Sequence, residues 1–525
     1  MIFVSVLDTL RATVKGGDML TTLDGLVIGS YILLIMAVGS WFGRRQADTR
    51  DYFLGGRSVP WWAAGLSVIA TETSALTFIG VPAVAYASDW QYIQLVTGSV
   101  LARFLLAFVL INVFYRADVF TPYGYLLKRF GPGTKNAAAV VFIFGRIFAS
   151  SFRLLGFAIA IKVVLSVPLS TAILITGIAA IIYTFLGGIR AVIWTDVVQG
   201  ATFMLGGGLS IYFLLRGIPG GWEGFLSVAR EHGKLTALDL GFRWDDPYNI
   251  VSGLVGGLFL TMATHGTDHD MVQRMLTCRN SGEGQRSIVL SGILVLPVVV
   301  TFLLVGSLLF AYYKLVQVPY ELPSQYKYIF PTFILHGLPA GLSGFVVAGL
   351  VAAAMSSLDS ALSALASTSV VDLYRPYIRR DAPESHYLKV SRILTVLWGA
   401  VLVGVAMSVG ATEDILAAGL GVMTLFYGSL LGVFLLARFT RRGNTITNGI
   451  GMALSVLLLT FLNHKTAILE ALGTTRGWLY ELDIAWPWFT VIGTALTFCV
   501  GALGRRKQVP FRVEFRPVQE GPALR

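Results

Sequence analysis

Polar or ionisable side chains interrupt four long apolar stretches of this chain, and these are the residues able to do chemistry inside a membrane. The first stretch, residues 64–80, reads AGLSVIATETSALTFIG and carries the carboxylate of Glu72. Its neighbours are the hydroxyl residues Thr71, Thr73, Ser74 and Thr77. A helix broken at bilayer depth can line a cavity and offer backbone carbonyls to a cation, and ionisable residues there are usually functional. The alternative is a polar seam buried between helices by mutual hydrogen bonds.

The second stretch, residues 184–200, carries Asp196 beyond a predicted cytoplasmic turn at Gly187 and Gly188. An acid in the first turn of a helix is stabilised by the helix dipole, which offers a purely structural explanation. Asp196 lies more than one helical turn past the basic Arg190, however. Its depth favours a role in handling an ion or a solute.

The third stretch, residues 261–275, gathers histidines and acids around Gly266. They are His265, Asp268, His269 and Asp270. Histidine and aspartate are good metal ligands, so a metal centre is one interpretation. No further ligand motif accompanies them, and a glycine at a membrane edge favours a broken helix or a helix end with capping acids.

The fourth stretch, residues 352–374, carries serines and Asp359 in an alanine-rich sequence. The spacing i, i+4, i+7, i+11 places four serines on one helical face. These are Ser356, Ser360, Ser363 and Ser367. Two interpretations remain open at this point: a close-packed helix interface of small residues, or hydroxyl ligands for a small hard cation.

The elements that must position these residues are membrane-spanning helices. Of the 525 residues, 55% are hydrophobic and 13% charged, against about 25% charged in a soluble domain. Thirteen apolar stretches approach the roughly 20 residues that cross a bilayer. They cover approximately 23–43, 60–86, 91–115, 137–165, 168–187, 191–216, 250–272, 287–315, 341–370, 389–410, 412–438, 445–463 and 485–504. We therefore predict an all-α polytopic membrane protein.

Basic residues follow every second predicted span, and the positive-inside rule makes those loops cytoplasmic. This predicts an outer N-terminus and a cytoplasmic C-terminus in the plasma (inner) membrane, in agreement with an odd number of spans. The net charge of +11 is then explained by helix ends facing membrane lipid, and no nucleic-acid partner is indicated.

The interrupted spans occupy corresponding positions in two sets of five. Residues 60–216 and 250–438 form these sets, and each set opens with a span broken by polar residues and glycine. Because the sets begin on opposite sides of the membrane, they have the topology of an inverted repeat. One helix (23–43) precedes them, and two helices (445–504) and a cytoplasmic tail (505–525) follow. We predict a single membrane transport domain over residues 1–525.

Three motifs in order along the chain resemble the sodium:solute symporter family. They are GGIRAVIWTDVVQ at 187–199, VQRML at 272–276 and AAAMSSLDSALSA at 352–364, and the resemblance extends over roughly 24–440, from the RDYFLGGRS stretch at 50–58 onward. It implies the LeuT-type fold, with one preceding helix, a ten-helix inverted-repeat core and two following helices.

The resemblance also implies a sodium site. Its ligands are the backbone carbonyls of Ala70, Thr73 and Ala353 and the hydroxyls of Ser356 and Ser357. Asp196 matches a family aspartate tied to sodium coupling, and some relatives hold a second sodium between it and further serines. Here Ser360 is present, but Asp359 stands where a hydroxyl is expected, and Glu72 is a further acid near the break. Sodium is the only metal implied, as coupling ion, and no cofactor is expected.

The same resemblance implies a solute pocket between the two broken spans. Its candidate residues are Ser74, Thr77, Gln91, Gln94, Thr261, Thr264 and His265. Val295 and Leu420 stand near positions where sugar-transporting relatives carry polar groups. This argues against a close copy of a glucose or galactose pocket, and leaves monocarboxylates, vitamins, amino acids or another sugar arrangement open.

The predicted function is secondary active transport: sodium-coupled symport of a small organic solute by alternating access. A proton-coupled symporter of the same fold is the nearest alternative, because Glu72, Asp196 and Asp359 are titratable. An intramembrane enzyme is a remote alternative that would need a nucleophile–base pair or a metal cage, and the sequence has no such motif. The solute, the number of sodium ions and the oligomeric state stay open.

Overall fold

Helices make up every element in the described part of the chain. The computed structural model describes residues 20–43, 49–184, 189–410, 414–473 and 476–505. The longer helices up to residue 217 are α2 (Thr22–Gly43), α4 (Trp61–Glu72), α5 (Ala75–Ala87), α6 (Tyr92–Leu106), α9 (Pro132–Leu165), α10 (Leu169–Thr184) and α11 (Ile189–Gly217). Those after it are α13 (Gly257–Thr267), α14 (His269–Leu276), α15 (Ser281–Leu315), α17 (Leu342–Thr368), α19 (Glu384–Val409), α20 (Ile415–Phe439), α21 (Thr445–Ala471) and α23 (Pro487–Ala502).

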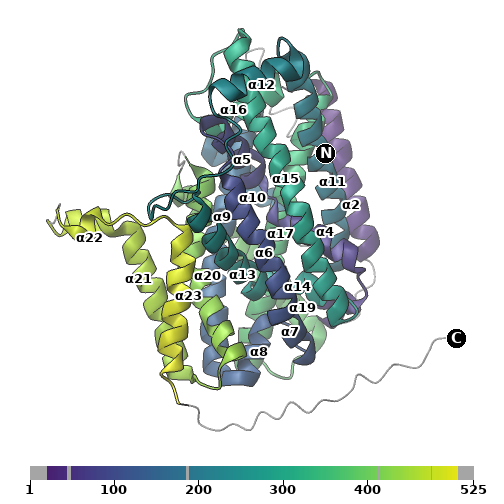
Figure 1. Cartoon of the computed structure of the whole chain (residues 1–525). Helices are drawn as coiled ribbons and strands as arrows, with labels where there is room; N and C mark the ends of the chain where they lie inside the picture. Colours follow the sequence, from purple (N-terminus) through teal and green to yellow (C-terminus); the bar gives the residue numbers. More distant parts are fainter. Residues whose placement is uncertain (1–19, 44–48, 185–188, 411–413, 474–475, 506–525) are drawn as a thin grey trace.

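Short helices complete the described chain. They are α3 (Thr49–Leu54), η1 (Gly55–Arg57), α7 (Asn112–Arg116), α8 (Pro122–Phe130), α12 (Gly221–Glu231), η4 (Tyr326–Tyr328), α16 (Ile329–His336), α18 (Arg375–Tyr377) and α22 (Trp478–Glu481). Three π-helical turns, η2 (Ala107–Ile111), η3 (Ser252–Gly256) and η5 (Ser369–Tyr374), adjoin long helices. In Figure 1, α12 and α16 lie at one end of the bundle and α8 at the other.

Nine helices in the described ranges are long and apolar enough to cross a membrane alone. The pair α4 and α5 qualifies as one span bent by 60°. The all-helical polytopic prediction is thus confirmed. Each of the thirteen predicted intervals contains at least one helix. Thirteen as the number of crossings stays a prediction, as does the division into repeats and following helices.

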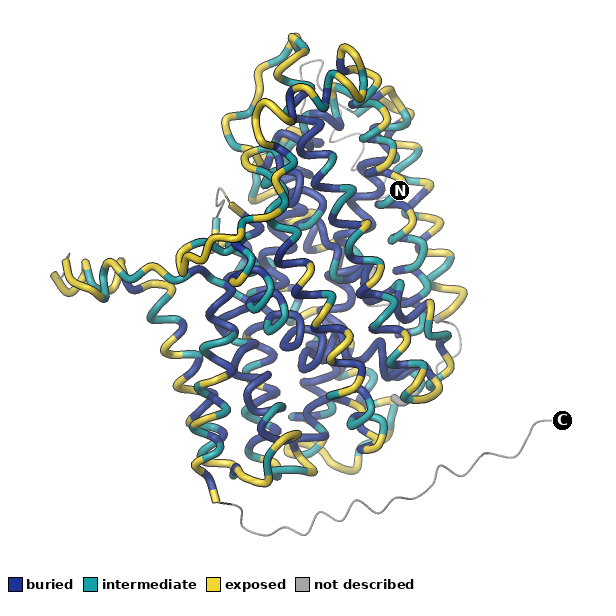
Figure 2. Tube along the Cα trace, viewed as in Figure 1, coloured by how far each residue is buried: buried dark blue, intermediate teal, exposed yellow. Residues whose placement is uncertain are grey.

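Burial separates a central group of helices from a peripheral one. In both α9 and α17, 83% of the residues in an apolar stretch of 18 residues are buried inside the protein, against 11% in α2 and 28% in α19 and α21. Figure 2 shows the buried residues concentrated along the middle of the bundle. The polar residues of α17 are therefore held inside the protein, where an ionisable or hydroxyl group needs a partner.

Close helix approach depends on glycine where α6 meets the α13 region. A Cβ added at Gly98 would lie 2.3 Å from the carbonyl oxygen of Leu254, and one at Gly257 would lie 2.1 Å from that of Leu95. Small residues allow this separation, as in other membrane bundles. The contact fixes α6 against the second broken span.

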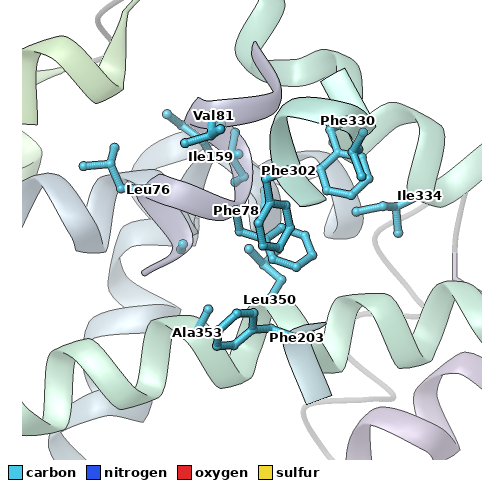
Figure 3. Packing of buried hydrophobic residues seen from close by; sticks show 14 of the residues in the cluster. Leu76, Phe78, Val81, Ile159, Phe203, Phe302, Phe330, Ile334, Leu350 and Ala353 are labelled. Carbon is cyan, nitrogen blue, oxygen red and sulfur yellow. The ribbon is translucent and has the colours of Figure 1, made fainter. Parts of the chain in front are cut away.

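An aromatic cluster closes the bundle beyond the first broken span. The ring of Phe78 on α5 lies 5.0 Å from that of Phe302 on α15 and 5.2 Å from that of Phe330 on α16. Phe203 on α11 lies 6.3 Å from Phe302, and Figure 3 shows it near Leu350 and Ala353 of α17. This apolar packing positions α5 and α17 beside the polar break.

Candidate functional site

The first helix break lies between α4 and α5. Thr73 leaves helical geometry (φ −76°, ψ 87°), and its amide still donates to Ile69 O at 2.9 Å. Ser74 then caps α5, because its Oγ accepts a hydrogen bond from the Leu76 amide at 3.2 Å. Among the described residues, no hydrogen bond ends on the carbonyl of Ala70 or Thr73. Both oxygens are therefore free to bind a cation.

Helix α17 packs against α4 and α5 and brings its serines to this break. Ser356 and Ser357 are fully buried. The Oγ of Ser357 donates to Ala353 O at 2.9 Å, one turn back along the helix. The three predicted α17 ligands thus share one turn on an element that contacts the break.

Asp196 of α11 joins α4 to α17. Its Oδ1 accepts a hydrogen bond from Ser356 Oγ at 2.6 Å, and its Oδ2 accepts one from Ser67 Oγ at 2.5 Å and one from Thr71 Oγ1 at 3.3 Å. The carboxylate is completely buried. Its position beside Ser356 ties it to the predicted sodium ligands.

Arg274 of α14 is the cation that faces Asp196, and sequence reasoning missed its role. Its Nη2 lies 3.2 Å from Asp196 Oδ2, its Nε donates to Ser67 Oγ at 2.9 Å, and it also donates to Ser360 Oγ. An arginine in the middle of the VQRML motif was a signal that could have been followed.

Asp359 and Ser360 lie on the same turn of α17. Asp359 Oδ1 accepts from the Ser360 amide at 2.6 Å and from its hydroxyl at 3.1 Å. Its Oδ2 is buried and has no hydrogen-bond partner in the described part of the protein. The arrangement leaves one carboxylate oxygen open next to the Arg274 contact.

The second helix break lies between α13 and α14, at Asp268 (φ −74°, ψ 124°). Asp268 caps α14 by accepting from the Asp270 amide at 2.8 Å. Its Oδ2 accepts from Tyr427 at 2.5 Å and from Arg146 Nη1 at 3.1 Å. The predicted broken helix with capping acids is therefore present. Over the described ranges, no group of three or more His, Cys, Asp or Glu side chains could hold a metal ion.

A cavity of about 100 Å³ lies between the two breaks. Its walls include five of the predicted solute residues and Glu72. The five are Ser74, Thr77, Thr261, Thr264 and His265. Val295 and Leu420, the two departures from sugar-transporting relatives, contribute apolar wall.

The other two predicted solute residues lie outside the cavity wall. The Nε2 of Gln94 donates to Tyr248 O at 2.6 Å, which directs the side chain towards the loop before the second broken span. Gln91 precedes α6, and its backbone amide donates to Asp89 Oδ1 at 2.9 Å. Both residues were expected to face the pocket from the start of the third span, but neither is among the residues of the cavity wall.

Three arginines line or border the cavity, and sequence reasoning did not single them out. Arg103 is paired with Glu72 and lies 3.2 Å from His265 Nε2, and Arg146 is paired with Asp268 and Asp270.

Arg153 differs from these two arginines. Its one hydrogen bond among the described residues is with Thr71 O, at 3.5 Å, and no carboxylate there lies within ion-pair distance. Arginines seven residues apart in the apolar α9 were the missed signal, because this spacing places them on one face.

The comparisons with known proteins concern the chain as a whole. Residues 52–454 match the model of the sodium:solute symporter family. The sodium/sialic acid symporter NanT of Aliivibrio fischeri is 30% identical over 495 residues, covering 92% of each chain. The human sodium/iodide cotransporter is 28% identical over 444 residues, covering 82% of this chain and 68% of its own.

Solved structures include a sodium-coupled sialic acid symporter in a substrate-bound, outward-open state. It superposes with a TM-score of 0.79 at 27% identity, covering 92% of this chain and 97% of that one. A nucleobase-cation-symport transporter, Mhp1, matches with a TM-score of 0.53 at 13% identity and supports the fold alone.

The chain belongs to the sodium:solute symporter family. It is a multi-pass membrane transporter and not an enzyme. Its transported partners are sodium, as the coupling ion, and a small-molecule solute.

Proposed function

We propose that this symporter carries a small organic anion, and that Arg153 binds its carboxylate. The observation that supports this is the charge state of the cavity wall. Arg103 and Arg146 have carboxylate partners, whereas Arg153 has none within ion-pair distance among the described residues. A buried unpaired cation is costly, and a carboxylate can accept two parallel hydrogen bonds from a guanidinium. A bound organic acid would supply the missing partner.

The part of the cavity wall around Glu72 suits polar substituents on that acid. Glu72 remains 27% exposed although it is paired with Arg103. Ser99 accepts hydrogen bonds from Arg103 Nη1 and from Thr261 Oγ1, both at 2.8 Å. Hydroxyl, amide or amine groups of a solute would find both donors and acceptors here. Val295 and Leu420 would exclude water from its apolar face. Sugar acids, hydroxy acids and amino acids fit this combination.

In the proposed cycle, sodium binds to the carbonyls of Ala70, Thr73 and Ala353 and to the hydroxyls of Ser356 and Ser357. These oxygens come from both sides of the α4–α5 break, so a bound ion would tie the break to α17. An anion carried with sodium partly offsets its charge in the low-dielectric interior. We also propose a plasma-membrane location with the N-terminus outside and the C-terminus in the cytoplasm, as the basic loops indicate.

The test uses the full chain reconstituted in vesicles, with sialic acid as the first labelled probe and a panel of small hydroxy and amino acids beside it. We expect uptake of at least one acid in sodium and none in choline at the same pH. Uptake that persists in choline would instead indicate proton coupling.

A matched pair of ligands tests the charge assignment. The acid that is transported should stabilise the purified protein against heating, and its uncharged methyl ester should not. In Arg153→Gln this discrimination should disappear, whereas Arg441→Gln, on an exposed loop, should retain it. Equal stabilisation by acid and ester in the unaltered protein would reject an anionic solute.

A further inference from the structure

Five buried side chains of alternating charge form a continuous ion-pair network that runs from the solute cavity to Asp196. In order they are Asp268, Arg146, Asp270, Arg274 and Asp196. The Asp268–Arg146 distance is 3.1 Å, Arg146 contacts Asp270 directly, and the last two links measure 2.6 and 3.2 Å. Every member is at most 1% exposed.

The two ends of this ion-pair network belong to the two halves of the transport site. Asp268 and Arg146 line the solute cavity, and Asp268 also accepts a hydrogen bond from Tyr427 of α20. At the other end Asp196 accepts from Ser356, one of the proposed sodium ligands. The ion-pair network therefore offers a physical connection between the solute cavity and the proposed sodium site.

Competition for partners makes this connection able to transmit a change. Arg274 divides its guanidinium between Asp270 and Asp196, and Asp270 divides its carboxylate between Arg274 and Arg146. A sodium ion near Ser356 would satisfy part of the charge of Asp196 and release Arg274 towards Asp270. Asp270 would then hold Arg146 less strongly, and Arg146 would turn more fully to Asp268 on the cavity wall. At these separations, charges in a protein interior interact strongly.

We propose that Asp270 and Arg274 are positioning residues that set the sodium affinity and couple it to the solute cavity. This inference rests on the proposed sodium site. It predicts opposite changes in sodium affinity for two substitutions. Asp270→Asn should leave Arg274 bound to Asp196 and weaken sodium binding, on the order of tenfold. Arg274→Gln should remove the internal cation that competes for Asp196 and tighten sodium binding by a similar factor. A merely structural role would weaken binding in both.

The first experiment measures sodium affinity without any solute. Purified full-length protein is heated at increasing sodium concentration, with choline holding the ionic strength constant, and the midpoint of stabilisation is read. Asp372→Asn is the matched control, because Asp372 is also buried and is paired with Lys135 at 3.5 Å, outside the ion-pair network. It should change the melting temperature and leave the sodium midpoint unchanged. Weaker sodium binding in both test variants would overturn the proposal.

A double-mutant cycle keeps the proposal testable if Arg274→Gln does not fold. Tyr427→Phe removes a donor to Asp268, so Arg146 should shift towards Asp268 and sodium binding should tighten about threefold through the ion-pair network. In the Asp270→Asn background, where the network is interrupted, Tyr427→Phe should have no effect on sodium binding. If the two substitutions have additive effects and sodium still binds, the coupling role of the network is rejected and the sodium site is not. If sodium does not stabilise the unaltered protein at all, sodium coupling itself is rejected, and the role of the network with it.

Discussion

The two helix breaks differ in which cation satisfies them. At the α4–α5 break the cap is the neutral Ser74, and the carbonyls of Ala70 and Thr73 accept no hydrogen bond from the described residues. At the α13–α14 break the cap is Asp268, which already holds Arg146. Similar interruptions of the backbone thus produce two kinds of site. One is left open to a mobile ion, and the other is closed by a cation that belongs to the protein.

Arg146→Ala should break this comparison with the largest effect. It removes the internal cation from the second break and leaves Asp268 and Asp270 as buried carboxylates with fewer partners. Removing one member of a buried ion pair costs about 3–5 kcal/mol, so we expect loss of folded protein or a large fall in melting temperature. Thermal unfolding in detergent measures this. A melting temperature equal to that of the unaltered protein would show that the second break does not depend on its arginine.

Ser356→Ala should disable the open break and leave the fold largely intact. The substitution removes one proposed sodium ligand and the hydroxyl that donates to Asp196. We expect sodium affinity to fall more than about tenfold, because a hydrogen bond to a charged group and an ion ligand are lost together. The control is Ser363→Ala, on the same face of α17 but without a contact to Asp196. A comparable loss of sodium affinity in both variants would contradict the assignment.

Sequence reasoning found the open break more completely than the closed one. The sequence reveals Glu72 with its neighbouring hydroxyl residues, and the serines of α17, because polar groups in an apolar stretch are rare. Asp268 was predicted as a cap or a break. Its partners Arg146 and Tyr427 lie on α9 and α20, far away in sequence, so no local pattern pairs them.

Arg153 was missed for a related reason. An arginine within an apolar helix is visible in the sequence, but whether it is paired depends on which carboxylates the other helices bring near it. Gln91 and Gln94 illustrate the opposite case. Both were expected to face the pocket, but neither is among the residues of the cavity wall, and the side chain of Gln94 donates to the carbonyl of Tyr248.

Ser74→Ala should sharpen the comparison with a smaller effect. It removes the α5 cap and leaves the carbonyls of Ala70 and Thr73 in place. Loss of an N-terminal cap costs about 1 kcal/mol, so we expect a modest fall in melting temperature. Ser74→Asn should restore the cap, because asparagine also accepts from the backbone amide. If both variants lose stability equally, the role of Ser74 at the break is not that of a cap.

The smallest effect concerns Cys278, which follows α14 and reports whether the closed break stays packed. The thiol is completely buried, and burial raises its pKa to about 12. Because only the thiolate reacts, labelling at neutral pH should be slower than for an ordinary thiol by a factor of about 1,000, and its rate should keep rising with pH beyond the usual thiol range.

The measurement uses maleimide labelling in a Cys499→Ser background, so that Cys278 is the remaining thiol. With and without sodium, labelling of Cys278 should stay slow, since Arg146 and Asp268 hold the start of α14 in both conditions. In Asp268→Asn, which weakens that ion pair, labelling should become faster. Rapid labelling of the otherwise unaltered protein on removal of sodium would mean that the second break opens together with the first.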